Sequence, residues 1–270
     1  MKLLAFDIDQ TLIDDTFDEN GDWVVFPEVI DALNTLLIKG NAVLFASGRP
    51  YSGIKIFMDR LMPSNNVYAA SSNGAALFTR DGRILSSHYI PFCSLDEMIA
   101  CFPDHPNYTY MVYFQDNVLG YKGKLNFAPI EAKSNNMKMV DLNITEVKGD
   151  CPVEKTFMNL GNENSSTIIA PKEMREKYEA FASGANFYEF IHKGVSKASS
   201  ARELAALLHI DHDDIYGFGD GENDYELVRD FHGTALSNSI KKVQDVAEYV
   251  STSVKERGAV KALKEKWHLI

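Results

Sequence analysis

Residues 1–12 read MKLLAFDIDQTL, and the rest of the chain is arranged around this stretch. Residues 3–6 form a short apolar run bounded by polar residues, which is typical of a buried parallel strand. Asp7 and Asp9 follow at its carboxyl end, with Thr11 two positions later. Ligands bind at this edge of open α/β sheets, and two carboxylates so close together repel each other unless a cation balances them. A solvated acidic loop has the same pattern, so the other strand ends decide between the two interpretations.

Composition limits the classes of function. The chain has 270 residues, 45% hydrophobic and 24% charged, which predicts a globular protein of one large or two ordinary domains. Its net charge of −11 argues against nucleic acid or an anionic membrane surface as a partner and is compatible with a bound metal cation. The N-terminal apolar run is too short for a signal peptide, and no stretch approaches the length of a membrane-spanning helix.

The cysteines argue against a disulfide framework and against a zinc site. Cys93, Cys101 and Cys151 are odd in number and show no CxxC spacing. A reducing cytoplasm is therefore the expected location.

The first third of the chain alternates between strand and helix patterns. Predicted strands at 42–46 and 67–71 end in polar turns, SGR at 47–49 and SNGA at 72–75. A helix is predicted from Pro27 to Gly40, between the strand at 3–6 and the strand at 42–46. A hydroxyl followed by glycine before a new helix offers donors to an anion. Strands and helices of these lengths predict a parallel sheet with right-handed crossovers.

Two hairpins are predicted beside this sheet. Asn20-Gly21 is a strong turn signal, so residues 12–26 are expected to form a small flap over the end of the first strand. Asp81-Gly82 predicts a second hairpin, which extends to about residue 90.

A mixed pattern of helices and antiparallel strands occupies residues 84–190, and it predicts an inserted α+β cap. Within it, the region 123–153 has no clear pattern. The predicted elements are helices at 95–102 and 171–181 and strands at 109–115, 118–121, 154–160 and 186–191. The catalytic core is then formed by residues 1–83 and 191–270.

The strand–helix alternation resumes at GVSKA, where Lys197 precedes a predicted helix. A strand at 215–218 runs directly into GDGEND at 219–224. Its glycines permit tight turns, and its acids, Asp220 and Asp224 among them, would repel each other without a cation. The fold class is therefore α/β, a doubly wound and mostly parallel sheet with an inserted cap.

The order of these motifs resembles the haloacid dehalogenase-like (HAD) phosphatase superfamily. DIDQT at 7–11, SGR at 47–49, Lys197 and GDGEND follow one another as they do there. SNGA, the insert and ALSNS at 235–239 resemble its Cof-type, type IIB branch. Gln10 stands where the family usually has glycine, so the flap conformation or the rate is expected to differ without loss of a catalytic group.

The resemblance implies a set of roles. Asp7 would be the nucleophile that forms an aspartyl-phosphate, and Asp9 would be the general acid and base. Mg²⁺ would be bound by Asp7, the backbone carbonyl of Asp9 and Asp220. The remaining implied residues are Ser47, Gly48, Lys197 and Asn223 at the phosphate, Asp224 and Thr11 as supports of the metal site, and Asn73 and Arg49 in the substrate pocket.

The expected function is a Mg²⁺-dependent phosphatase of small phosphorylated metabolites, such as sugar phosphates. A phosphosugar mutase is the first alternative, and conversion of a sugar 1-phosphate to its 6-phosphate without phosphate release would identify it. The second alternative is a non-enzymatic switch whose aspartate is phosphorylated for signalling. Asp9 and the large insert favour turnover over a switch. The sequence predicts neither the natural substrate nor the oligomeric state.

Overall fold

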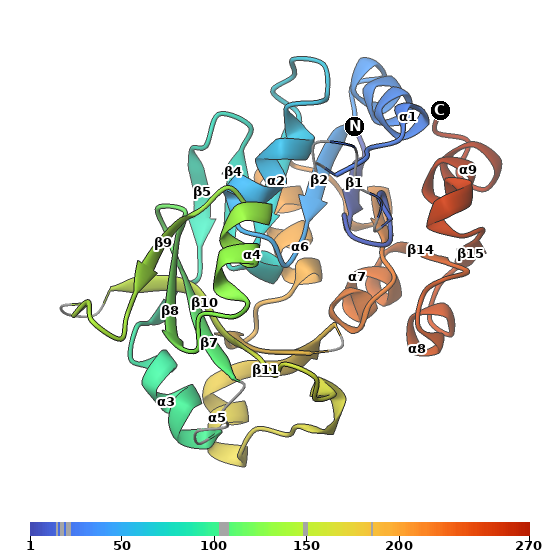
Figure 1. Ribbon diagram of the computed structural model, residues 1–270. Helices are drawn as coiled ribbons and strands as arrows, with labels where there is room; N and C mark the ends of the chain where they lie inside the picture. Colours follow the sequence, from blue (N-terminus) through green and yellow to red (C-terminus); the bar gives the residue numbers. More distant parts are fainter. Residues whose placement is uncertain (15, 17–18, 20–22, 103–107, 148–150, 185) are drawn as a thin grey trace.

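The computed structural model describes residues 1–14, 16, 19, 23–102, 108–147, 151–184 and 186–270. They form two sheets, an eight-stranded one and a seven-stranded one (Figure 1). We call the first sheet with its helices the core, and the second sheet with its helices the cap. The α/β class predicted from the sequence is confirmed.

The core sheet has the strand order β15-β14-β13-β1-β2-β3-β4-β5. Its first six strands are parallel, and β4 and β5 add an antiparallel edge. The core elements are β1 (Leu3–Phe6), α1 (Pro27–Ile38), β2 (Ala42–Ala46), α2 (Tyr51–Met58), β3 (Val67–Ser71), β4 (Ala76–Thr79), β5 (Ile84–Ser87), α6 (Lys197–Leu207), β13 (Ile215–Phe218), α7 (Tyr225–Asp230), β14 (His232–Leu236), α8 (Lys241–Gln244), β15 (Tyr249–Ser251) and α9 (Gly258–Glu265).

Alternate residues of β1 point into two separate hydrophobic layers. Leu4 and Phe6 pack with α1, α2 and α9, whereas Leu3 and Ala5 pack with α6 and α7. All four side chains are fully buried. A strand that is buried on both faces must be apolar throughout, which explains the uninterrupted run at the N-terminus. The strand is thus fixed on both faces, and its carboxyl end is held in place for the residues that follow.

The cap sheet has the order β11-β12-β10-β7-β8-β9, with β6 paired to β10. Its pairs are antiparallel, except that β8 and β9 run parallel. The cap elements are β6 (Ile90–Pro91), α3 (Ser94–Cys101), β7 (Thr109–Phe114), β8 (Val118–Gly123), α4 (Ala128–Ser134), β9 (Lys138–Asp141), β10 (Pro152–Asn159), α5 (Lys172–Lys177), β11 (Tyr178–Ser183) and β12 (Phe187–His192).

Among the described residues, hydrogen bonds join the cap to the core at α2 and at the end of β3. At α2, the backbone N–H of Ser52 donates to Asn117 Oδ1 at 3.2 Å. At the end of β3, the cap residue Glu154 accepts hydrogen bonds from the Ser71 and Ser72 hydroxyls at 2.8 and 2.6 Å. In Figure 1 the cap, drawn from green to yellow, lies to one side of the core strands, with α4 near α2.

Several elements differ from the sequence prediction. The helix predicted for 171–181 ends at Lys177, and residues 178–183 form β11, which pairs with β12. The region without a clear pattern holds α4 and β9. A strand, β14, occupies 232–236, where none was predicted. The Asn20-Gly21 turn lies outside the described residues.

The division at 84 and 190 stays a prediction. Strand β5 pairs with β4 in the core sheet, and β12 extends to His192 in the cap sheet. We therefore place the start of the cap between β5 and β6, a few residues later than the sequence suggests.

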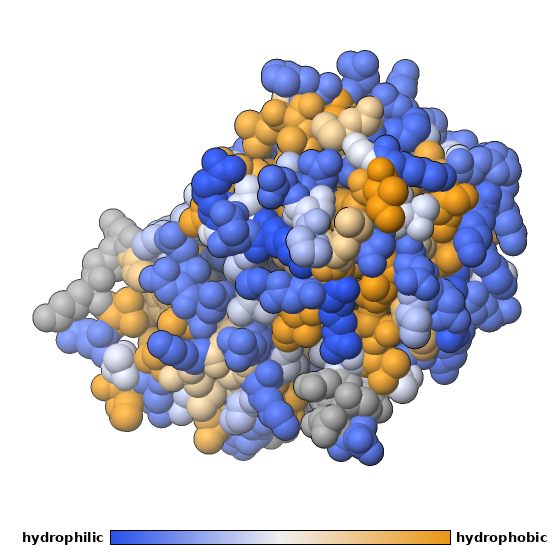
Figure 2. Space-filling view, turned by 90° about the horizontal axis from the view of Figure 1, so that it is seen from above, coloured by the Kyte–Doolittle hydropathy of each residue, from blue (hydrophilic) through white to orange (hydrophobic). Residues whose placement is uncertain are grey.

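Figure 2 shows the molecule from above the view of Figure 1. Hydrophilic residues cover most of this face, and hydrophobic residues form patches separated by them. Among the described residues, none of the helices combines the length and the apolar composition that crossing a bilayer requires. The three cysteines are free.

Candidate active site

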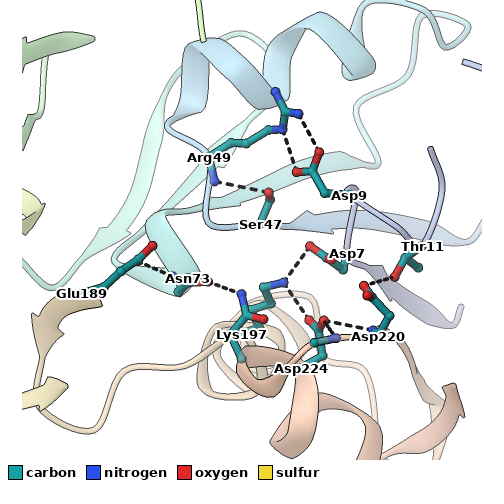
Figure 3. Close-up of polar contacts among 12 residues, drawn as sticks. Asp7, Asp9, Thr11, Ser47, Arg49, Asn73, Glu189, Lys197, Asp220 and Asp224 are labelled. Carbon is teal, nitrogen blue, oxygen red and sulfur yellow. Dashed lines mark hydrogen bonds and ion pairs between the residues drawn. The ribbon is translucent and has the colours of Figure 1, made fainter. Parts of the chain in front are cut away.

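The polar residues that follow the core strands meet at one edge of the sheet (Figure 3). Asp7 comes directly after β1, and its backbone N–H donates to the carbonyl of Phe218, the last residue of β13, at 2.9 Å. That bond places the loop at 219–224 beside Asp7. Residues separated by more than 200 positions in the chain are therefore neighbours at this edge.

Three carboxylates form the centre of the site. Asp7, Asp220 and Asp224 each offer an oxygen atom, and these atoms lie within 4.8 Å of one another. Lys197 is 1% exposed, and its Nζ donates to Asp7 Oδ1 and to Asp224 Oδ1, both at 2.6 Å. The Thr11 hydroxyl donates to Asp220 Oδ1 at 3.1 Å. One ammonium group thus faces three carboxylates.

Lys197 reaches this place because it begins helix α6. Ser196 is the cap of that helix: its hydroxyl accepts the backbone N–H of Ser199, and Ser199 Oγ accepts the backbone N–H of Ser196. This reciprocal arrangement satisfies two backbone donors at the helix start. It fixes the first turn, and with it the direction of the Lys197 side chain.

Asp224 is a support rather than an open ligand. Its Oδ2 accepts the backbone N–H groups of Asp220 and Gly221 at 3.1 and 3.0 Å, and its Oδ1 is bound by Lys197. A Cβ atom on Gly219 would lie 2.3 Å from the Asp224 Cβ, so only glycine lets this side chain reach under the loop. Asp7 and Asp220 are the carboxylates left for a cation.

The pKa values reflect this crowding. Burial and the nearby Asp224 charge raise the pKa of Asp7 well above its ordinary value, against the effect of Lys197. Burial and Asp224 also raise the pKa of Asp220 to about 7. Burial lowers the pKa of Lys197, but Asp224 and Asp7 together raise it above its ordinary value. The carboxylates repel one another more than the single lysine compensates.

Asp9 is paired with Arg49. The guanidinium donates to both carboxylate oxygens, from Nε at 2.8 Å and from Nη2 at 2.6 Å. Arg49 is buried and stacks over the rings of Trp23 and Phe57, at 4.7 and 5.3 Å from their centroids. Burial lowers the pKa of Arg49, but the Asp9 charge and hydrogen bonds raise it above its ordinary value. Arg49 lines a cavity between the core and the cap, and its charge is directed at Asp9.

Ser47 and Asn73 come from adjacent strand ends. The backbone N–H of Arg49 donates to Ser47 Oγ at 3.2 Å, and that of Asn73 donates to the Ser47 carbonyl at 2.8 Å. Asn73 has a φ of 62° and lies in the short 3₁₀ turn at 72–74. Asparagine tolerates this left-handed conformation better than most residues. The turn aims its side chain at Asn223, whose Nδ2 donates to Asn73 Oδ1 at 2.8 Å.

Gln10 also has a positive φ, of 59°. A side chain is strained in this conformation, whereas glycine adopts it freely. Gln10 lines the same cavity as Asp7 and Asp9.

The cap contributes residues that were not predicted from the sequence. Glu189 Oε2 accepts from Asn73 Nδ2 at 2.9 Å, and Glu189 Oε1 accepts from Lys155 Nζ at 3.0 Å. Glu154 binds the serines at the end of β3. The available signal was a charge inside an apolar strand, EKTFMNL at 154–160 and FYEFI at 187–191. A buried charge in such a strand needs a partner, and the partner here belongs to another element.

A cavity of about 890 Å³ lies between core and cap. Asp7, Asp9 and Asp220 line its core side, with Ser47, Gly48 and Asn223 beside them. Its volume is within the range of small-molecule sites. Lys197 and Asp224 are buried and contact this wall through Asp7 and Asp220, and cap residues line the opposite side.

Comparisons with known proteins identify a family and several relatives of this chain. A family model described as haloacid dehalogenase-like hydrolase matches residues 4–263. The Bacillus subtilis (strain 168) protein named "Putative phosphatase YxeH" is 28% identical over 272 residues, which cover 98% of this chain and 97% of that protein. The phosphatase YwtE of the same strain, named for 5-amino-6-(5-phospho-D-ribitylamino)uracil, is 24% identical over 288 residues, covering 96% and 95%.

A solved structure has the same fold. The HAD subclass IIB sugar phosphatase BT4131 superposes with a TM-score of 0.76 at 21% identity, over 100% of both chains. The superposition extends over the core and the cap together.

Proposed function

The chain belongs to the haloacid dehalogenase-like hydrolase family, and on that premise we propose that it is a Mg²⁺-dependent phosphatase of small phosphorylated metabolites. The observation that carries the proposal is the placement of Asp7, which faces Lys197 and lines a cavity of about 890 Å³. The names of the relatives support the substrate class, since two of them are phosphatases of a ribityl phosphate and of sugars.

In the first step, an Asp7 oxygen attacks the phosphorus of the substrate. A P–O bond to Asp7 forms as the bond to the ester oxygen breaks, and Asp9 gives its proton to that leaving oxygen. The product is an aspartyl-phosphate and a free alcohol. Lys197, Ser47 and the Gly48 N–H are assigned to the phosphoryl oxygens, where positive charge and donors stabilise the transition state.

In the second step, Asp9 takes a proton from a water molecule whose oxygen attacks the phosphorus. The P–O bond to Asp7 breaks, which releases phosphate and restores the carboxylate. Arg49 orients Asp9 by its two hydrogen bonds. Opening one of them frees an Asp9 oxygen for the leaving group or the water.

The residues present fit a divalent cation. Three carboxylates share the charge of Lys197, and burial with mutual repulsion raises the pKa of two of them. A hard cation that prefers oxygen ligands relieves this imbalance. We assign Asp7, Asp220 and the backbone carbonyl of Asp9 as its ligands, with Asp224 and Thr11 as supports. When bound, Mg²⁺ supplies positive charge beside the phosphoryl oxygens.

The two alternatives from the sequence make different products. A phosphosugar mutase returns the phosphoryl group to a sugar, and a signalling switch keeps it on Asp7. The match to a hydrolase family favours transfer to water. The free cysteines are compatible with a cytoplasmic setting for this reaction.

The test is phosphate release from a panel of phosphorylated metabolites and from p-nitrophenyl phosphate, with and without Mg²⁺. We expect Mg²⁺-dependent release from the aryl ester and from a subset of the metabolites. Isomerisation of a sugar phosphate without release would favour the mutase. A stable phosphoprotein without turnover would favour the switch.

A further inference from the structure

The cap side of the cavity contains a buried ion pair. Lys155 on β10 and Glu189 on β12 have side chains that are 5% and 4% exposed, and both line the cavity. The Lys155 ammonium lies over the rings of Tyr113 and Phe157, at 4.8 and 4.6 Å from their centroids. The pair is therefore held from behind by the cap sheet and faces the core.

Stability alone does not explain this pair. Removing two charges from water costs about as much as their attraction returns, so an apolar pair of the same volume would stabilise the cap equally well. Exposed pairs in the same cap, such as Lys122 with Asp96, carry no such desolvation cost. The presence of a charged pair at a cavity wall is better explained by a polar molecule that binds in the cavity and contacts the pair.

Both side chains keep hydrogen-bonding capacity. Within the described residues, Glu189 is the one hydrogen-bond partner of the Lys155 ammonium, which has three donors. Each Glu189 oxygen accepts one bond and can accept another. A hydroxyl both donates and accepts, so adjacent hydroxyls can bridge the carboxylate and the ammonium.

The charge of this wall argues against an acidic leaving group. Glu131 also lines it, and its Oε1 accepts from the Tyr113 hydroxyl and from Asn135. Burial raises the pKa of Glu131. The raised pKa favours the neutral form of Glu131, so the charges on this wall are mainly those of Glu189 and Lys155, which are paired with each other. Arg49 is engaged by Asp9, and Lys133 is exposed at the rim.

We infer that Lys155 and Glu189 form the leaving-group subsite of the proposed phosphatase, and that they select a neutral polyhydroxylated group over one that carries an acid. The inference rests on the proposed function. Glu189 also binds Asn73, which accepts from Asn223 at the phosphate side. Glu189 thereby connects the inferred leaving-group subsite to the residues assigned to the phosphate, and Figure 3 shows its contact with Asn73.

The experiment compares kcat and KM for two sets of substrates with Mg²⁺ present. Glucose 6-phosphate, mannose 6-phosphate, fructose 1-phosphate and ribose 5-phosphate are the neutral set. 6-Phosphogluconate and 3-phosphoglycerate are the acidic set, and p-nitrophenyl phosphate is the reference. We expect the best neutral ester to exceed both acids by about tenfold or more in kcat/KM, because an acid there meets the Glu189 carboxylate, while the buried cations Lys155 and Arg49 are already paired.

The variant is Lys155→Met with Glu189→Gln, which removes both charges at similar volume, while the new amide keeps an oxygen that can accept from Asn73. Lys122→Met is the matched control, since it breaks an exposed lysine–aspartate pair in the same sheet. We expect the ratio of kcat/KM for the best neutral ester to that for the aryl ester to fall by about tenfold or more, mainly through KM. The control should keep the ratio of the wild type.

The outcomes separate the two proposals. A folded double variant with an unchanged ratio, or a wild type that prefers the acids, overturns the subsite while phosphatase activity stands. No turnover of any ester by the wild type overturns the function and the subsite together. If the double variant does not fold, the kcat/KM values of the wild type still test the inference, because a preference for the acidic esters would contradict it.

Discussion

Lys197 Nζ lies 2.6 Å from Asp7 Oδ1, although 190 residues separate the two in the chain. The contact is buried on both sides, and the same ammonium binds Asp224. It joins the first strand of the core to the first helix after the cap. The insertion of the cap therefore leaves the two halves of the core connected at the point where the chemistry is proposed to occur.

Lys197→Met should cost both stability and activity. Removing one partner of a buried ion pair leaves uncompensated charge, which typically costs about 3–5 kcal/mol. Urea unfolding in the presence of a chelator measures this loss, and phosphate release measures the activity. Lys2→Met is the control, because Lys2 pairs with Asp214 near the surface, where loss of a pair costs about 1 kcal/mol or less. Equal losses in the two variants would count against the buried pair.

Gln10→Gly should change the free energy of unfolding by less than about 1 kcal/mol. Glycine relieves the strain of the positive φ but has more conformational freedom to lose on folding, so the two effects largely cancel. Gln10→Val should destabilise clearly, since a β-branched residue is poorly tolerated at this φ. Urea unfolding of both variants tests whether the positive φ of Gln10 is strained. A valine variant as stable as the glycine variant would show that Gln10 is unstrained.

Glu154 should make stability depend on pH. Burial raises its pKa, although the Ser72 and Ser71 hydroxyls oppose the rise. A carboxyl whose pKa is higher in the folded than in the unfolded state contributes fully below the ordinary value of 4.5. That contribution is lost as the pH rises through the folded pKa. Stability from this group therefore declines above about pH 4.5.

Glu154→Gln removes that titration while keeping an acceptor for the serines. We expect the free energy of unfolding of the variant to fall less steeply than that of the wild type between about pH 4.5 and pH 8. Glu146→Gln, at an exposed cap position, should keep the slope of the wild type. If Glu154→Gln and Glu146→Gln give the same slope, Glu154 does not couple cap packing to pH.

Divalent metal should be required for activity and should stabilise the fold. Chelation should stop phosphate release, and Mg²⁺ should restore it, whereas Ca²⁺ should substitute poorly because it prefers more ligands. Mg²⁺ should also raise the Tm of the wild type by binding the native state. Asp220→Asn should abolish that rise, and Asp59→Asn, at an exposed acid, should retain it. A Tm that is insensitive to Mg²⁺ in the wild type would remove the metal assignment.

Much of the core was predictable because its signals are local. The apolar run at 3–6 and the turn at 219–224 reveal strand ends through neighbouring residues alone. In the cap, residues 171–181 illustrate the limit. Their composition permits a helix throughout, but pairing with β12 draws residues 178–183 into a strand. Pairing with β12 determines the structure of residues 178–183, and the local sequence pattern carries no information about that pairing.

The placement of the candidate site residues was predictable where each follows a strand in one motif, and not where two charges in separate elements become partners. Asp7, Asp9 and Asp220 stand out by spacing at strand ends. Lys155 and Glu189 are single charges in different strands, and only the order of the cap sheet makes them partners. The same holds for Arg49, whose engagement with Asp9 depends on the adjacency of β1 and β2.

The most direct test of the central proposal is phosphate release by Asp7→Asn at saturating substrate and Mg²⁺. A neutral amide cannot form the aspartyl-phosphate, so we expect no turnover above the detection limit from a variant that still melts cooperatively. Asp213→Asn, at a fully solvated acid, is the control and should match the wild type. Turnover by purified Asp7→Asn within about a hundredfold of the wild type would contradict the assignment of Asp7 as the nucleophile.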